Sequence, residues 1–198
     1  MKKITLILIL VFCFHISFGQ EDQKKIDLIE ADKTWGKEII NVPFWFAPEI
    51  NYKGFEDIRF AKGWENIESD GFWVLAFAWD INLKTKPTEK FFEESLKLYF
   101  DGLMKVVNEN KDITIPKTKA LFAKSETKKE TTYFTGIVKT YDAFTTKKII
   151  NLYVSIEIYY CKKTNNYIPL FKFSPKEFTH KTWETLNEIK LLPDLCSN

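Results

Sequence analysis

Histidine is nearly missing from this chain of 198 residues, which has only His15 and His180. His15 lies in residues 1–19, which we expect to be removed, so the mature chain keeps only His180 and cannot build a zinc site from several histidines. The sequence also lacks the G-x-S-x-G, H-E-x-x-H and P-loop motifs of serine hydrolases, zinc proteases and nucleotide-binding proteins. We therefore expect no metal and no cofactor, and no residue pattern identifies a catalytic centre. His180 is expected to be an ordinary surface residue.

Arginine is equally scarce, because Arg59 is the one arginine beside 28 lysines. Arginine offers a planar fork of donors that the lysine ammonium cannot replace. We therefore expect a specific role for Arg59, either a structural pairing or a ligand contact.

Residues 1–19 have the pattern of an export signal. Lys2 and Lys3 form a positive start, residues 4–14 an apolar core, and Ser17 and Gly19 a small-residue cleavage site. The sequence therefore predicts a periplasmic or secreted protein, cleaved near Gly19, with residues 20–198 forming a single domain. No second apolar run reaches membrane-spanning length, so we expect no anchor in the mature chain.

The chain also has no excess of positive or negative charge once the leader is removed. Its two lysines leave 27 basic residues against 27 acidic ones. A neutral chain of this kind has no electrostatic reason to bind nucleic acid or an anionic membrane surface.

Cysteine is limited to three residues, of which Cys13 lies in the leader. In an oxidising compartment the remaining pair, Cys161 and Cys196, could form a disulfide that holds the C-terminal tail on a strand. The alternative is two unpaired thiols, because sequence alone cannot place the two residues within bonding distance.

Hydrophobic periodicity predicts an α+β fold. We expect a helical N-terminal segment at 20–40, an irregular segment at 43–70 with one short strand, and a strand at 72–83 that is apolar on both faces. A long helix begins at Thr88 and ends near Asn108. The remaining elements are strands near 119–125, 131–142, 148–161 and 167–173, and a C-terminal helix at 176–191.

The order of these elements favours an antiparallel sheet packed on, or wrapped around, the long helix, as in cystatin-like and NTF2-like rolls. An open sandwich of sheet and helices is the competing arrangement. A likeness at this level carries no function.

Aromatic residues are abundant where the other types are scarce, and they concentrate in residues 43–79. Flat rings can stack on a ligand while charged groups fix its orientation. One interpretation is a ligand site whose stacking residues and polar anchors are Trp45, Trp64, Trp73, Glu56, Asp57 and Arg59. The other is a lid that packs over the core and is tied down by an Asp57–Arg59 pair. Glu56 and Asp57 cannot flank one glycosidic bond, because neighbours in an extended chain point to opposite faces.

The stretches GFEDIRFAKGW at 54–64 and FWVLAFAW at 72–79 resemble an uncharacterised family of secreted bacterial proteins. This resemblance implies export and a single domain, and it assigns no activity.

Together these observations predict a soluble exported binding domain. Its ligand would be a small apolar or glycan-like molecule, or a partner protein, bound through residues 43–79. The alternatives are a hydrolase that uses acidic residues alone, and an inhibitor or immunity-type protein of an exported enzyme.

Overall fold

The computed structural model describes residues 27–110, 112–128 and 131–196, so the expected leader lies outside the described residues. Within them the chain forms nine strands and two helices. In chain order these are β1 (Ile29–Glu30), β2 (Gly36–Val42), β3 (Gly54–Phe60), β4 (Leu75–Asp80), α1 (Glu89–Val107), β5 (Lys119–Lys128), β6 (Thr131–Tyr141), β7 (Ile149–Cys161), β8 (Asn166–Ser174), α2 (Thr182–Glu188) and β9 (Lys190–Leu191).

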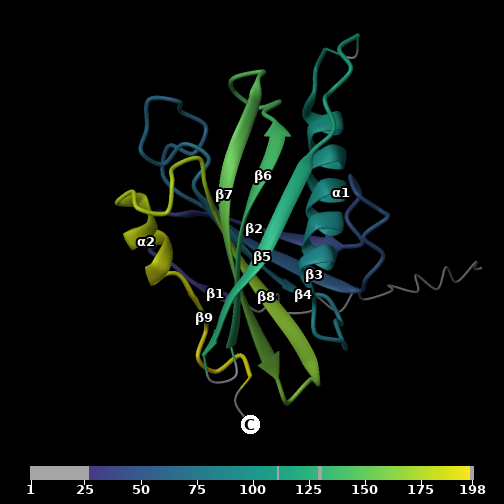
Figure 1. The fold of residues 1–198 in the computed structure, drawn as a ribbon, viewed down its shortest axis with the longest axis vertical. Coiled ribbons are helices and arrows are strands. Elements are labelled where there is room, and N and C mark those ends of the chain that lie inside the picture. The colour runs from purple at the N-terminus through teal and green to yellow at the C-terminus, as the bar shows by residue number, and fades with distance from the viewer. Residues whose placement is uncertain (1–26, 111, 129–130, 197–198) are drawn as a thin grey trace, which may run out of the picture.

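Seven strands form one antiparallel sheet in the order β2-β3-β4-β8-β7-β6-β5, while β1 pairs separately with β9. Figure 1 shows β5, β6 and β7 running upright while β2, β3 and β4 cross behind them, so the sheet is strongly twisted. The expected α+β class is confirmed, and so are the four consecutive strands β5 to β8.

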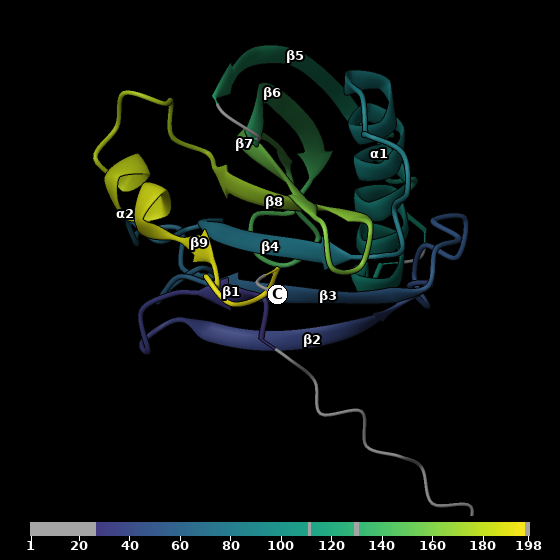
Figure 2. The same cartoon turned by 90° about the horizontal axis from the view of Figure 1, so that it is seen from below.

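Strand β4 lies between β3 and β8 and is buried on both faces, as its sequence predicts. Leu75, Phe77 and Trp79 belong to the larger core, which also contains apolar side chains of α1. Ala76 and Ala78 face a smaller core formed with β1, α2 and the residues around them. Figure 2 shows α1 and α2 well apart, with the strands of the sheet between them.

Helix α1 begins and ends where its capping residues predict. The Thr88 side chain accepts a hydrogen bond from the backbone N–H of Phe91, and Asn108 is the C-terminal cap. The buried side of the helix carries the expected apolar stripe, including Phe92, Leu96 and Phe100. These side chains join α1 to the larger core.

The predicted N-terminal helix is wrong for the residues that the structure describes, because residues 27–42 contain β1 and β2 instead. All seven residues of β2 pair with β3, from Gly36 opposite Phe60 to Val42 opposite Gly54. The β-branched residues of β2 suit such a ladder, and tertiary pairing overrides a weak helical spacing.

The predicted C-terminal helix is confirmed only in part. It spans Thr182–Glu188 and is much shorter than 176–191. The chain leaves the helix at Ile189, and Lys190 and Leu191 then pair with β1.

Candidate ligand-binding site

A cavity of about 250 Å³ lies between α1 and the β2–β4 end of the sheet; we call it the aromatic cavity. The register of the strands forms the side of the cavity that belongs to the sheet. Glu38, Ile58 and Phe77 are cross-strand partners on β2, β3 and β4, so their side chains lie next to one another on one face. Nine of its fifteen lining residues are aromatic. The lining consists of Glu38, Ile40, Trp45, Phe46, Ile58, Phe60, Trp64, Trp73, Leu75, Phe77, Tyr99, Phe100, Leu103, Val107 and Phe144.

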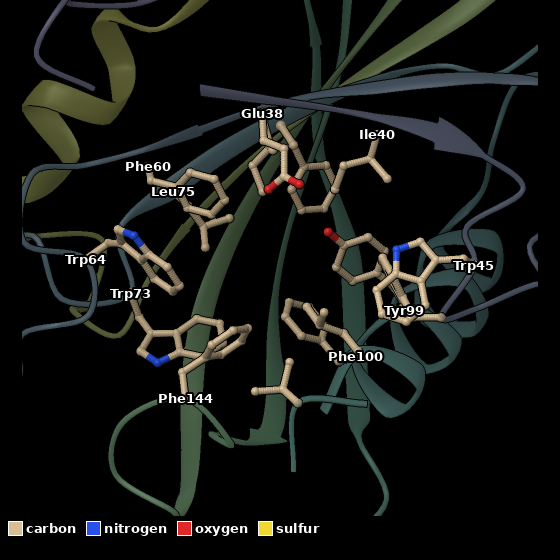
Figure 3. Close-up of a pocket in the computed structure, with 15 residues that line it drawn as sticks. Glu38, Ile40, Trp45, Phe60, Trp64, Trp73, Leu75, Tyr99, Phe100 and Phe144 are labelled. Atoms are coloured by element: carbon tan, nitrogen blue, oxygen red, sulfur yellow. The ribbon is translucent and has the colours of Figure 1, made fainter. Parts of the chain in front are cut away.

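The three tryptophans predicted as stacking residues all line this cavity. Trp64 and Trp73 lie edge to face with ring centroids 6.4 Å apart, and Phe144 from the β6–β7 connection packs against both. Figure 3 shows these three rings on one side of the cavity, with Trp45 and Tyr99 on the other. Segments far apart in the sequence therefore form the two walls.

Exposure differs greatly among the three tryptophans. The Trp73 side chain is buried, Trp64 is half-buried, and Trp45 is 72% exposed at the rim of the cavity. The Trp73 Nε1 donor is buried and has no hydrogen-bond partner within the described part of the chain. The cavity therefore passes from a buried wall to an open rim.

Glu38 is the one charged residue of the lining, and the sequence analysis missed it. Figure 3 shows its carboxylate pointing into the space between the two walls. Among the residues that the structure describes, it makes no hydrogen bond and no ion pair. Alternation in β2 puts Glu38 and Ile40 on one face, a pattern that the helical assignment of this segment concealed.

Glu56 lies behind the cavity wall and is completely buried. Trp79 Nε1 donates to its Oε2 at 2.7 Å, and the Tyr99 hydroxyl donates to its Oε1 at 3.0 Å. Burial raises the pKa of Glu56 to about 8, against the opposing effect of these two hydrogen bonds. Glu56 does not line the cavity; it positions Tyr99, which does.

Asp57 and Arg59 face the other side of the sheet and do not reach the cavity. Asp57 Oδ2 accepts hydrogen bonds from the backbone N–H groups of Leu28 and Ile29 at 2.8 and 3.1 Å. Arg59 pairs with Asp57 and donates to the Ile29 carbonyl oxygen at 3.3 Å. Burial raises the pKa of Asp57, although the Leu28 N–H and the charge of Arg59 oppose this. The pair therefore ties down β1, and not the aromatic segment.

Cys161 and Cys196 are unpaired thiols in the structure. They lie close enough for Cys196 to donate to Cys161, which helps to lower the pKa of Cys161 against the effect of its burial. Burial raises the pKa of Cys196 to about 12. The disulfide stays a prediction.

The chain matches no family of known proteins, no curated protein and no solved structure. Over the described ranges, no group of three or more His, Cys, Asp or Glu residues could hold a metal ion. No helix in that part of the chain is both long and apolar enough to span a bilayer.

Proposed function

We propose that the protein is exported and binds a small apolar ligand in the aromatic cavity. One observation carries the proposal: the cavity is lined by nine aromatic and five aliphatic residues and a single charged one. A largely apolar pocket with very few polar groups is the usual form of a small-molecule site. Its volume of about 250 Å³ suits a compact ligand. Export rests on the leader pattern of residues 1–19.

The position of Trp45 supports this proposal. A core tryptophan would be covered by the fold, whereas this one is 72% exposed at the rim. A ligand that covered the ring would remove its apolar surface from water, at about 25 cal/mol for each Å². The fold alone provides no such cover.

The lining favours an apolar ligand over a glycan. Sugar hydroxyl groups need several polar partners when they leave water. The lining has no amide side chain, and its one side-chain hydroxyl, on Tyr99, already donates to Glu56.

The two acids of the predicted site, Glu56 and Asp57, are also engaged elsewhere. Both oxygens of Glu56 and both oxygens of Asp57 accept hydrogen bonds within the fold. Neither residue lines the aromatic cavity, so acid catalysis there has no support from these side chains.

We also propose that the fold is a roll of the cystatin-like or NTF2-like kind. The proposal is supported by a long helix that shares its core with one antiparallel sheet of seven strands. This likeness of architecture adds nothing to the functional argument.

The proposal is tested with N-phenyl-1-naphthylamine, a neutral probe whose fluorescence rises in apolar surroundings. We expect saturable binding that Trp45→Ala weakens by about tenfold, equivalent to about 1.4 kcal/mol. The matched control is Leu121→Ala, because Leu121 is also 72% exposed but lies outside the cavity lining. Absence of saturable binding, or equal losses in the two variants, would overturn the proposal.

A further inference from the structure

The charge that lines the aromatic cavity is of one sign, and it lies on the exposed side of the cavity. Glu38 is its one charged lining residue, and the lining contains no lysine, arginine or histidine. The chain holds 28 lysines, but residues 38–52 and 63–83, which supply much of the lining, contain no basic residue. A ligand in the cavity therefore meets a negative charge and no positive one from the lining.

Glu38 has no partner of its own. Lys37, its neighbour in β2, points the other way and pairs with Asp27. The carboxylate of Glu38 makes no hydrogen bond or ion pair with any residue that the structure describes, and it points into the cavity (Figure 3). Glu38 is an exposed residue, so its carboxylate is hydrated, and a cationic group held here would replace that water with a charge-assisted contact.

The aromatic rings of the cavity also favour a cationic ligand. The face of an aromatic ring carries negative charge density, so a cation lying over it is attracted, most strongly where water is excluded. Trp45 and Tyr99 lie on one side of the Glu38 carboxylate, and Trp64, Trp73 and Phe144 lie on the other (Figure 3). Several aromatic rings and one carboxylate thus lie around the same space.

Anions are disfavoured for the matching reason. Burial is the main cause of the raised pKa values of Glu56 and Tyr99, and the negative charge of Glu38 adds to both as a minor effect, in Tyr99 after the effect of Glu56. A ligand carboxylate or phosphate would enter this field without a basic side chain in the lining to pair with.

We propose that the ligand is a compact hydrophobic cation, an amine or a quaternary ammonium, whose charged group lies beside Glu38. Its apolar part packs against the wall that Trp64, Trp73 and Phe144 form together. This inference rests on the proposed function, since it assigns a ligand class to the same cavity.

Three probes of nearly the same shape separate charge from apolar burial. They are benzyltrimethylammonium, its neutral carbon analogue neopentylbenzene, and the anion 2,2-dimethyl-3-phenylpropanoate, each used to displace N-phenyl-1-naphthylamine. We expect the cation to bind at least about tenfold more tightly than the anion. Glu38→Gln should weaken the cation by about three- to tenfold and change the neutral probe by less than about twofold.

The matched control is Glu68→Gln, which removes the same charge from an exposed residue outside the lining. It should leave all three affinities unchanged. If the naphthylamine binds but the anion displaces it as well as the cation does, or Glu38→Gln leaves the cation unaffected, the cation assignment is overturned while the cavity remains a binding site. If neither the naphthylamine nor any of the three probes binds, the proposed function itself is overturned.

Discussion

Replacing Glu56 with glutamine tests whether the fold keeps this buried side chain protonated. Its pKa of about 8, raised by burial, makes the neutral acid the main form at pH 7. In the structure Oε2 accepts from Trp79 Nε1 and Oε1 accepts from the Tyr99 hydroxyl. In the neutral acid Oε2 can still accept, while the proton on Oε1 is donated to the Tyr99 oxygen once that hydroxyl rotates. Glutamine has nearly the same shape and can accept and donate in the same two places. We therefore expect the Glu56→Gln variant to fold and to lose only the part of the pH dependence of stability that comes from titration of Glu56.

The magnitude follows from the difference between the folded and unfolded states. A glutamate in the unfolded chain has a pKa near 4.5, so between this value and about 8 the folded state holds a proton that the unfolded state has released. Stability therefore falls as the pH rises, by about 1.4 kcal/mol per pH unit for one proton. From about pH 5 to pH 8, the wild-type protein should lose roughly 3 to 4 kcal/mol that Glu56→Gln does not lose.

Urea unfolding of both proteins across this pH range measures the effect. Other buried acids titrate in both proteins and cancel in the difference; Asp57 and Asp80, whose pKa values burial also raises, are examples. Glu68→Gln, an exposed charge change, should reproduce the wild-type curve. If the difference between wild type and Glu56→Gln is flat with pH, or grows in the opposite direction, Glu56 is ionised in the folded state and the reasoning is refuted.

Three further predictions concern other parts of the fold. Arg59→Ala leaves a buried carboxylate without its cation and should cost about 3 to 5 kcal/mol of unfolding free energy; hydrogen exchange that stays slow at the β1 amides would contradict this. Gly102→Ala would place a methyl group 2.0 Å from the Phe46 carbonyl oxygen, so it should cost about 1 to 3 kcal/mol and weaken probe binding in the cavity; unchanged binding would contradict it. Cys161 and Cys196 should form a disulfide with oxidised glutathione, seen by mass spectrometry as loss of two hydrogens, and mixed disulfides with glutathione alone would contradict the pairing.

The elements that could be predicted from the sequence are those whose local pattern and tertiary role agree. Helix α1 has a capping residue at Thr88 and one apolar stripe, and it forms as expected. Strand β7 alternates apolar and polar residues, and its apolar set, including Leu152, Val154 and Ile156, is buried in the larger core. In both cases the periodicity alone determines the face that packs.

The N-terminal strands could not be predicted in the same way. Residues 27–42 have apolar spacings compatible with a helix, and only pairing with β3 makes Gly36–Val42 a strand. Residue periodicity within one segment cannot predict its pairing with another segment of the chain. This error also hid Glu38, because its place in the cavity depends on strand alternation.

The three tryptophans predicted as stacking residues, Trp45, Trp64 and Trp73, line one cavity, and their role in binding stays a prediction. Asp57 and Arg59 were grouped with them because they are close in sequence. Alternation along β3 sends these two side chains to one face, while Glu56 and Ile58 face the larger core. Nearness along a strand is therefore a poor guide to which residues share a site.

The pairing of β1 with β9 joins residues that are 162 positions apart, Ile29 and Leu191. The entropy lost in closing a loop grows with its length, so this ladder should be among the last contacts to form during folding. Leu28 and Ile29 from one end, and Trp183 from near the other, cover the small-sided face of β4 together. Removal of either the β1 segment or the α2–β9 segment should therefore loosen the packing of the other. During synthesis, β1 leaves the ribosome long before β9, so β1 can complete its packing only after β9 has been made.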